Sequence, residues 1–157
     1  MKREPRWLTT ARIERTARFM VPAEPAEVFP LLCPVLEYDW IPDWRCEMIY
    51  SKSGAAELGA MFKTRILPFG REHWTCVRYE PPKRIEYLFT HGSSIAVQLE
   101  LELAEESGKT ALDWTMRYTI VGALWRRLLR KRIDERSYLD MMRVRERQLA
   151  DYFSRRK

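Results

Sequence analysis

Apolar and polar residues alternate along most of the chain, which is the pattern of β-strands with one buried face. In residues 10–21, Ile13, Ala17, Phe19 and Val21 share one face, and the opposite face carries Arg and Glu side chains. Similar alternation marks further predicted strands at residues 44–50, 60–66, 85–91, 95–103 and 112–120. Because one face stays polar, we expect an antiparallel sheet with one solvent-exposed side, and parallel α/β folds are disfavoured.

Residues 71–80 form the least regular of the predicted strands. Trp74 and Cys76 have one parity, and Val77 and Tyr79 compete with them for the inner face. The Pro81-Pro82 pair that follows ends the strand, since proline lacks the amide donor of the ladder. The sequence predicts the strand but does not assign its two sides.

A short helix is predicted after the first strand. Pro25 lies near its start, Glu27 lies in its first turn, and Val28 and Leu31 share one face. Pro34 is expected to end it. An aromatic loop containing Trp-Ile-Pro-Asp-Trp then leads into the second strand.

Residues 123–153 contain neither Pro nor Gly and predict a long amphipathic helix. Its apolar stripe consists of Leu124, Leu128, Tyr138, Met142, Leu149 and Phe153. The same stripe also carries Lys131, Glu135 and Arg145, so its phase is imperfect. An unbroken helix of 31 residues would be about 46 Å long, more than the width of a small domain. We therefore expect a break near residues 131–135.

The length and composition of the chain indicate what kind of protein it is. The chain of 157 residues is 46% hydrophobic, which suits one domain over residues 1–157, with residues 1–9 loosely ordered. No apolar stretch approaches the ~20 residues of a membrane span, and no signal-peptide core is evident, so we expect a soluble, cytoplasmic protein. The spacing of Cys33, Cys46 and Cys76 fits neither disulfides nor metal ligands, which indicates reduced core residues.

The basic excess lies at the C-terminal end. Residues 123–157 hold 12 Lys and Arg against 5 Asp and Glu, whereas the whole chain has a formal charge of +6. Interleaved acidic residues favour the solvated face of a helix, and attraction to an anionic membrane surface is the alternative. No nucleic-acid motif accompanies the charge, so no nucleic-acid partner is expected. The oligomeric state is not indicated.

The order of elements resembles that of one superfamily. A strand, a short helix with an aromatic loop, six antiparallel strands and a long helix, together with segments 21–29 and 40–44, resemble the START-like, polyketide cyclase/dehydrase branch of the birch-allergen-like SRPBCC superfamily. The resemblance covers about residues 10–155. It implies an α+β helix-grip fold, in which a curved seven-stranded antiparallel sheet surrounds the C-terminal helix and encloses a cavity for an apolar ligand.

Parity then selects residues for the wall of such a cavity. The predicted ligand-binding residues are Trp40, Trp44, Met48, Tyr50, Phe62, Tyr87, Phe89, His91, Val97, Leu99, Trp114, Met116, Tyr118, Leu128, Tyr138 and Met142. A solid core made of the same residues is the alternative. Trp40 and Trp44 bracket a proline and are interpreted either as a gate at the cavity mouth or as a cap on the core.

Few residues indicate catalysis. His91 continues the inward parity of Tyr87 and Phe89 and is a weak catalytic candidate, because no carboxylate can be placed beside it. Arg15 has inward parity in the first strand. Lys131 and Glu135 have i, i+4 spacing, which suggests either a salt bridge or contact with the polar end of a ligand. No motif indicates a metal, a nucleotide or any other cofactor.

Three functions follow from these expectations. The first is binding or transport of a hydrophobic or aromatic small molecule, such as a lipid, quinone or polyketide. The second, implied by the resemblance, is a polyketide aromatase/cyclase-like enzyme. The third is a protein- or membrane-surface interaction module that uses the basic C-terminal helix.

Overall fold

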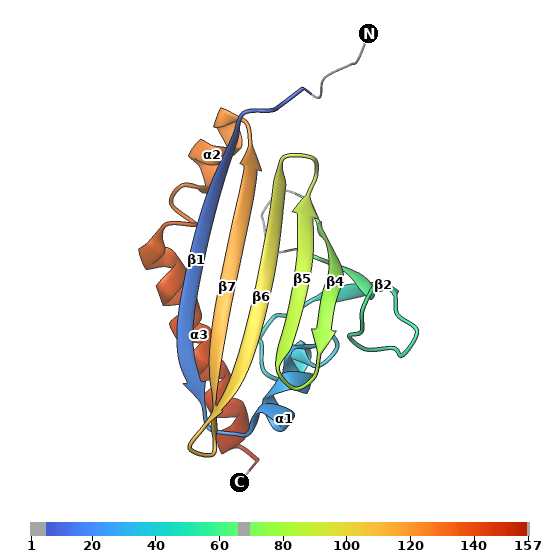
Figure 1. Ribbon diagram of the computed structural model, residues 1–157, viewed down its shortest axis with the longest axis vertical. Coiled ribbons are helices and arrows are strands. Elements are labelled where there is room, and N and C mark those ends of the chain that lie inside the picture. Colours follow the sequence, from blue (N-terminus) through green and yellow to red (C-terminus); the bar gives the residue numbers. More distant parts are fainter. Residues whose placement is uncertain (1–5, 66–69, 157) are drawn as a thin grey trace.

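Seven antiparallel strands form a single sheet in the computed structural model, which describes residues 6–65 and 70–156 (Figure 1). The strands are β1 (Thr10–Val21), β2 (Cys46–Tyr50), β3 (Met61–Thr64), β4 (Glu72–Glu80), β5 (Arg84–His91), β6 (Ile95–Glu106) and β7 (Lys109–Val121). Their order across the sheet is β1-β7-β6-β5-β4-β3-β2. From β2 to β7, strands that follow one another in the sequence pair with one another in the sheet. β1 instead pairs with β7, at the opposite edge from β2.

The pairing of β1 with β7 brings the first and last strands of the sheet together. Thr10 lies opposite Val121, and Val21 lies opposite Thr110, so the ladder runs the full length of β1. Along it, buried and exposed residues alternate as predicted from residues 10–21. This pairing leaves β1 and β2 as the two edges of the sheet.

A β-bulge accounts for the mixed parity of β4. The register between β4 and β5 shifts between Cys76 and Arg78. Before the shift Trp74 and Cys76 are buried, and after it Tyr79 lies opposite the buried Ile85 and packs against Phe29. An extra residue in one strand reverses which side chains face inward. The two competing parities of the sequence therefore belong to the two halves of one strand.

The C-terminal helical segment is broken, as predicted. It consists of α2 (Ala123–Leu129) and α3 (Glu135–Ser154), with the break at residues 130–134. The Asp134 carboxylate caps α3 by accepting a hydrogen bond from the Ser137 amide at 2.9 Å. No helix among the described residues is both long and apolar enough to cross a membrane.

Figure 1 shows α2 and α3 following one another along one side of the sheet, beside β1. The short elements α1 (Pro25–Val28), η1 (Phe29–Leu32) and η2 (Glu37–Asp39) lie between β1 and β2. The architecture is thus the predicted α+β helix-grip fold with an open seven-stranded sheet.

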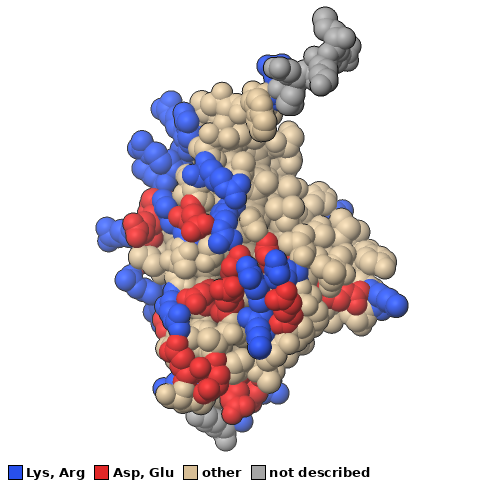
Figure 2. All heavy atoms as spheres, in the orientation of Figure 1, with Lys and Arg blue, Asp and Glu red and all other residues tan. Residues whose placement is uncertain are grey.

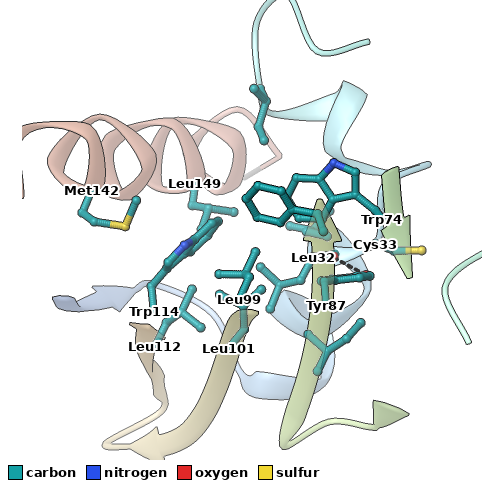
Figure 3. Close-up of a cluster of buried hydrophobic side chains, with 14 of the residues drawn as sticks. Leu32, Cys33, Trp74, Tyr87, Leu99, Leu101, Leu112, Trp114, Met142 and Leu149 are labelled. Atoms are coloured by element: carbon teal, nitrogen blue, oxygen red, sulfur yellow. Dashed lines mark hydrogen bonds between the residues drawn. The ribbon is translucent and has the colours of Figure 1, made fainter. Parts of the chain in front are cut away.

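The core lies between the sheet and α3. Trp114 and Leu99 point from the sheet toward Met142 and Leu149 (Figure 3). The Tyr138 hydroxyl donates a hydrogen bond to the Trp114 carbonyl oxygen, which ties α3 directly to β7. Each fully buried large apolar side chain, such as Leu149, contributes about 1.5–3 kcal/mol.

The expected Lys131–Glu135 salt bridge is absent among the described residues. The i, i+4 spacing brings side chains together only within one helix. Lys131 lies in the break, whereas Glu135 begins α3. Arg15 does face the helices, and its Nε donates a hydrogen bond to the Ile133 carbonyl oxygen at 2.9 Å.

The three cysteines are free, and Cys33 and Cys76 are buried, whereas Cys46 is half-buried. Residues 1–5 of the segment expected to be loosely ordered, and residue 66 at the end of the strand predicted over 60–66, lie outside the described residues. Residues 6–9 precede β1 without regular secondary structure.

Candidate functional site

A cavity of about 410 Å³ lies between the sheet and the helices. Strands β3 to β7 form one side of its wall. The end of α2, the break and α3 form the opposite side, and the segment from Pro34 to Trp44 contributes four further residues. Its size falls within the range of about 300–1,000 Å³ that small-molecule sites occupy.

Ten of the sixteen predicted ligand-binding residues line this cavity. Nine of them lie in β3, β5, β6, β7 or α3, where the inward parity of the sequence is retained. The ten residues are Trp44, Phe62, Tyr87, Phe89, Val97, Leu99, Trp114, Met116, Tyr118 and Met142.

Three predicted wall residues do not line the cavity. Met48 and Tyr50 are 36% and 58% exposed and do not line the cavity. They lie on the edge strand β2, whose register with β3 shifts between them. Leu128 is 54% exposed, and Leu129 takes its place in the wall because the helix break displaces the stripe by one residue.

Two further predicted residues belong to the packed core. Trp40 is only 3% exposed, and its indole nitrogen donates a hydrogen bond to the Leu31 carbonyl oxygen at 2.7 Å. Tyr138 is 1% exposed and is held by its bond to Trp114. Neither lines the cavity. The geometry thus favours the capping interpretation for Trp40, whereas Trp44 lies at the cavity itself.

His91 is buried outside the cavity wall. The structure places a carboxylate beside it after all, since His91 Nδ1 lies 3.6 Å from Glu72 Oε1. Glu72 is fully buried and also accepts a hydrogen bond from the Thr64 hydroxyl. The sequence could not show this pair, because it forms across two strands. Neither residue of the pair lines the cavity.

Stacked aromatic rings form the part of the wall near β3 to β5. The Trp74 ring stacks on Phe89 with centroids 3.9 Å apart and on Phe62 with centroids 5.3 Å apart. The Tyr87 ring packs edge-on against Phe62, and its hydroxyl donates to the Leu32 carbonyl oxygen at 3.0 Å (Figure 3). These ring contacts make this part of the wall aromatic and closely packed.

One buried donor in the wall lacks a partner. The Trp114 indole nitrogen is buried and has no hydrogen-bond partner among the described residues. Leaving a buried donor unsatisfied costs about 1–3 kcal/mol.

Among the described residues, Glu37 is the acidic residue that lines the cavity, and the pKa of its carboxyl is strongly shifted. Burial raises the pKa of its carboxyl to about 8, and the positive charge of Arg145 opposes this shift. Burial also lowers the pKa of Arg145, with the Glu37 charge acting in the opposite direction. The two groups influence each other electrostatically without forming a direct ion pair. At pH 7 the Glu37 carboxyl is mostly neutral and can donate a hydrogen bond or a proton to a ligand carbonyl.

Sequence patterns missed several polar wall residues. Glu37 lies in η2, a single turn too short to show a periodicity. Arg145 did leave a signal, since it is a charge on the apolar stripe of the helix. Lys131 left the same kind of signal, and it lines the cavity. Arg132 and Ser137 enter the wall beside it, at the helix break and the start of α3. Among the described residues, no group of three or more His, Cys, Asp or Glu could hold a metal ion.

The sequence model of a known family spans nearly the whole domain. The family is described as polyketide cyclase/dehydrase and lipid transport, and its match covers residues 11–151. The chain belongs to this family. A member of the polyketide cyclase/dehydrase and lipid transport family is expected to bind hydrophobic small molecules, which fits an apolar cavity in this place. A search of curated proteins found no match.

Solved structures share the fold at low sequence identity. Norcoclaurine synthase from Thalictrum flavum, solved with dopamine and hydroxybenzaldehyde, is 10% identical with a TM-score of 0.70, covering 100% of this chain and 97% of its own. Protein Mll3558 from Rhizobium loti is 16% identical with a TM-score of 0.64, covering 89% and 99%. CalU16 from Micromonospora echinospora is 17% identical with a TM-score of 0.54, covering 93% and 97%. These likenesses show the fold alone.

Proposed function

We propose that the protein binds or carries a hydrophobic or aromatic small molecule, of the lipid, quinone or polyketide kind, in the cavity between its sheet and α3. The observation that carries this proposal is the cavity of about 410 Å³, walled by stacked aromatic rings. Protein interiors are normally close-packed, and a void of this size deprives its lining of dispersion contacts. An apolar guest restores those contacts.

Binding of a neutral apolar fluorophore tests this proposal. We expect N-phenyl-1-naphthylamine to bind with a stoichiometry of one, and the heat capacity of binding to be negative because apolar surface is buried. Met116→Trp places an indole in the cavity and should weaken binding at least about tenfold, since the space for the guest is lost. Met20→Trp, on the exposed side of β1, is the matched control and should leave affinity unchanged. Equal affinity in all three proteins would place the probe outside the cavity and contradict the proposal.

The cyclase-like alternative needs a group that transfers protons within the cavity. His91 does not line the wall, so the earlier catalytic candidate gains no support from the geometry. Glu37 does line it, and its raised pKa suits a general acid near neutral pH. Glu37 is therefore the residue to test when a reaction is assayed.

An exposed amphipathic surface on α2 favours a second function, which we propose as contact with an anionic membrane surface. Leu124 and Leu128 are four residues apart and are 68% and 54% exposed. Arg126, Arg127 and Arg130 belong to the same segment. Figure 2 shows basic side chains gathered at the end of the molecule where α2 lies. Apolar and cationic side chains together suit a surface of anionic lipid.

Sedimentation with vesicles tests this second function. We expect the protein to sediment with vesicles that contain phosphatidylglycerol and to remain in solution with pure phosphatidylcholine. Leu124→Ser combined with Leu128→Ser should reduce sedimentation, as should neutralising Arg126 and Arg127. Sedimentation that persists in both variants would show that α2 is not the contact.

A further inference from the structure

A second hollow of about 560 Å³, here called the outer pocket, lies beside the cavity. Ile41, Trp44 and Arg145 line both, so the two hollows meet at these side chains. The wall of the outer pocket is strongly charged, unlike that of the cavity. It contains five cations, Arg45, Lys63, Arg65, Arg71 and Arg145, and two carboxylates, Asp43 and Glu47.

Most of these cations lack an acidic partner. Arg71 Nη1 contacts both carboxylate oxygens of Glu47, at 2.6 and 2.7 Å, so these two charges cancel. Lys63, Arg65 and Arg145 have no carboxylate within ion-pair distance among the described residues. The outer pocket thus has an uncompensated positive charge directly beside an apolar cavity.

Arg145 is the cation placed at the boundary of the two hollows. Its Nη1 donates a hydrogen bond to the Gln148 side-chain oxygen at 2.9 Å, and its Cζ lies 5.9 Å from the centre of the Trp40 ring. These neutral contacts orient the guanidinium but do not neutralise it. A partly buried cation without a counterion is unfavourable, and an anion supplied by a ligand would relieve this.

We propose that the protein takes an amphipathic anion, whose apolar body fills the cavity and whose carboxylate or phosphate group is held at the boundary by Arg145, with Lys63 and Arg65. This inference rests on the proposed function, because it needs the cavity to accept the apolar body. Arginine suits either a carboxylate or a phosphate, since its planar guanidinium group can donate hydrogen bonds to two oxygens at once. Lys63 and Arg65 add attraction from the outer pocket.

Glu37 does not oppose this arrangement near pH 7. Burial raises the pKa of its carboxyl, so the group stays mostly protonated beside Arg145. A neutral carboxyl neither cancels the guanidinium charge nor repels the acid group of a ligand. It can instead donate a hydrogen bond to that group.

Calorimetric titration at pH 7 with matched twelve-carbon ligands tests the proposal. We expect dodecanoate and dodecyl phosphate to bind about tenfold or more tightly than 1-dodecanol, since each gains a charge-assisted contact. Arg145→Gln should abolish this preference. Arg143→Gln should keep it, because Arg143 is exposed on the same helix and already pairs with Asp140. Acetate and inorganic phosphate alone should bind far more weakly than the dodecyl anions.

Each other outcome overturns the proposal in a distinguishable way. Equal affinity for the two anions and 1-dodecanol would remove the acid-group site and leave apolar binding intact. Failure of all three ligands, and of the neutral fluorophore, would remove the proposed function itself. Acetate or phosphate binding as tightly as the dodecyl anions would indicate an anion site independent of the cavity.

A second variant covers the case in which Arg145→Gln does not fold. Lys63→Gln combined with Arg65→Gln changes side chains at the outer pocket, away from the packed core. We expect it to weaken both dodecyl anions about threefold or more and to leave 1-dodecanol unchanged. An unchanged preference for the anions in this variant would contradict the assigned role of the outer pocket.

Discussion

Replacing Glu37 by Gln should flatten the pH dependence of stability between about pH 4.5 and 8. In the native protein burial raises the pKa of this carboxyl from 4.5 to about 8. Between these values the folded state holds a proton that the unfolded state releases, so the free energy of unfolding falls as the pH rises. A shift of this size corresponds to at most about 5 kcal/mol, and the partial exposure of Glu37 to solvent reduces this figure.

Urea denaturation at a series of pH values measures this effect. At pH 4 the two proteins should be almost equally stable, and above pH 8 Glu37→Gln should be the more stable one. The groups whose charges interact with Glu37 are Arg145, Cys33, Cys46 and Tyr87, and all of them remain in the variant. Glu135→Gln, which changes an exposed carboxylate, is the control and should keep the native slope. Parallel profiles for Glu37→Gln and the native protein from pH 5 to 9 would refute the reasoning.

Three further predictions address the gate, the helix break and the thiols. Trp40→Ala should lower the free energy of unfolding by about 3–5 kcal/mol in urea denaturation, because it empties a core position. Trp44→Ala should mainly weaken fluorophore binding, because Trp44 lines the cavity. If Trp40→Ala mainly weakened binding and Trp44→Ala mainly lowered stability, Trp40 would be the gate after all. Asp134→Ala should cost about 0.5–2 kcal/mol by removing the cap of α3, and an unchanged urea midpoint would contradict the observed cap. Burial raises the pKa of the Cys76 thiol to about 11. Cys76 should therefore react with Ellman's reagent at pH 8 only after the protein unfolds. Mass spectrometry of the modified peptides can check this.

The strands and the helix break could be predicted because local patterns carry them. In β5, β6 and β7 the alternation is regular, so residues such as Tyr87, Leu99 and Trp114 were placed correctly in the wall. In β4 the bulge at Cys76 mixed two parities and hid Trp74. In β2 the edge position exposed Met48 and Tyr50 even though their pattern was apolar.

The polar part of the site depends on tertiary structure and left little trace in the sequence. Glu37 in η2 and Arg145 in α3 line the same cavity and interact electrostatically, although they lie about a hundred residues apart in the sequence. The Glu72–His91 pair forms across strands in the same way. Charges on the apolar helix stripe, at Lys131 and Arg145, are the polar wall features that the pattern did show.

Native mass spectrometry of the freshly purified protein tests the central claim most directly. We expect a complex in which one apolar small molecule adds its mass to the chain and is released by organic solvent. We also expect that Met116→Trp, which fills the cavity, carries no such mass, whereas Met20→Trp retains it. Native protein that stays free of bound mass, and that takes up none of the dodecyl ligands or the fluorophore when these are added, would contradict the account.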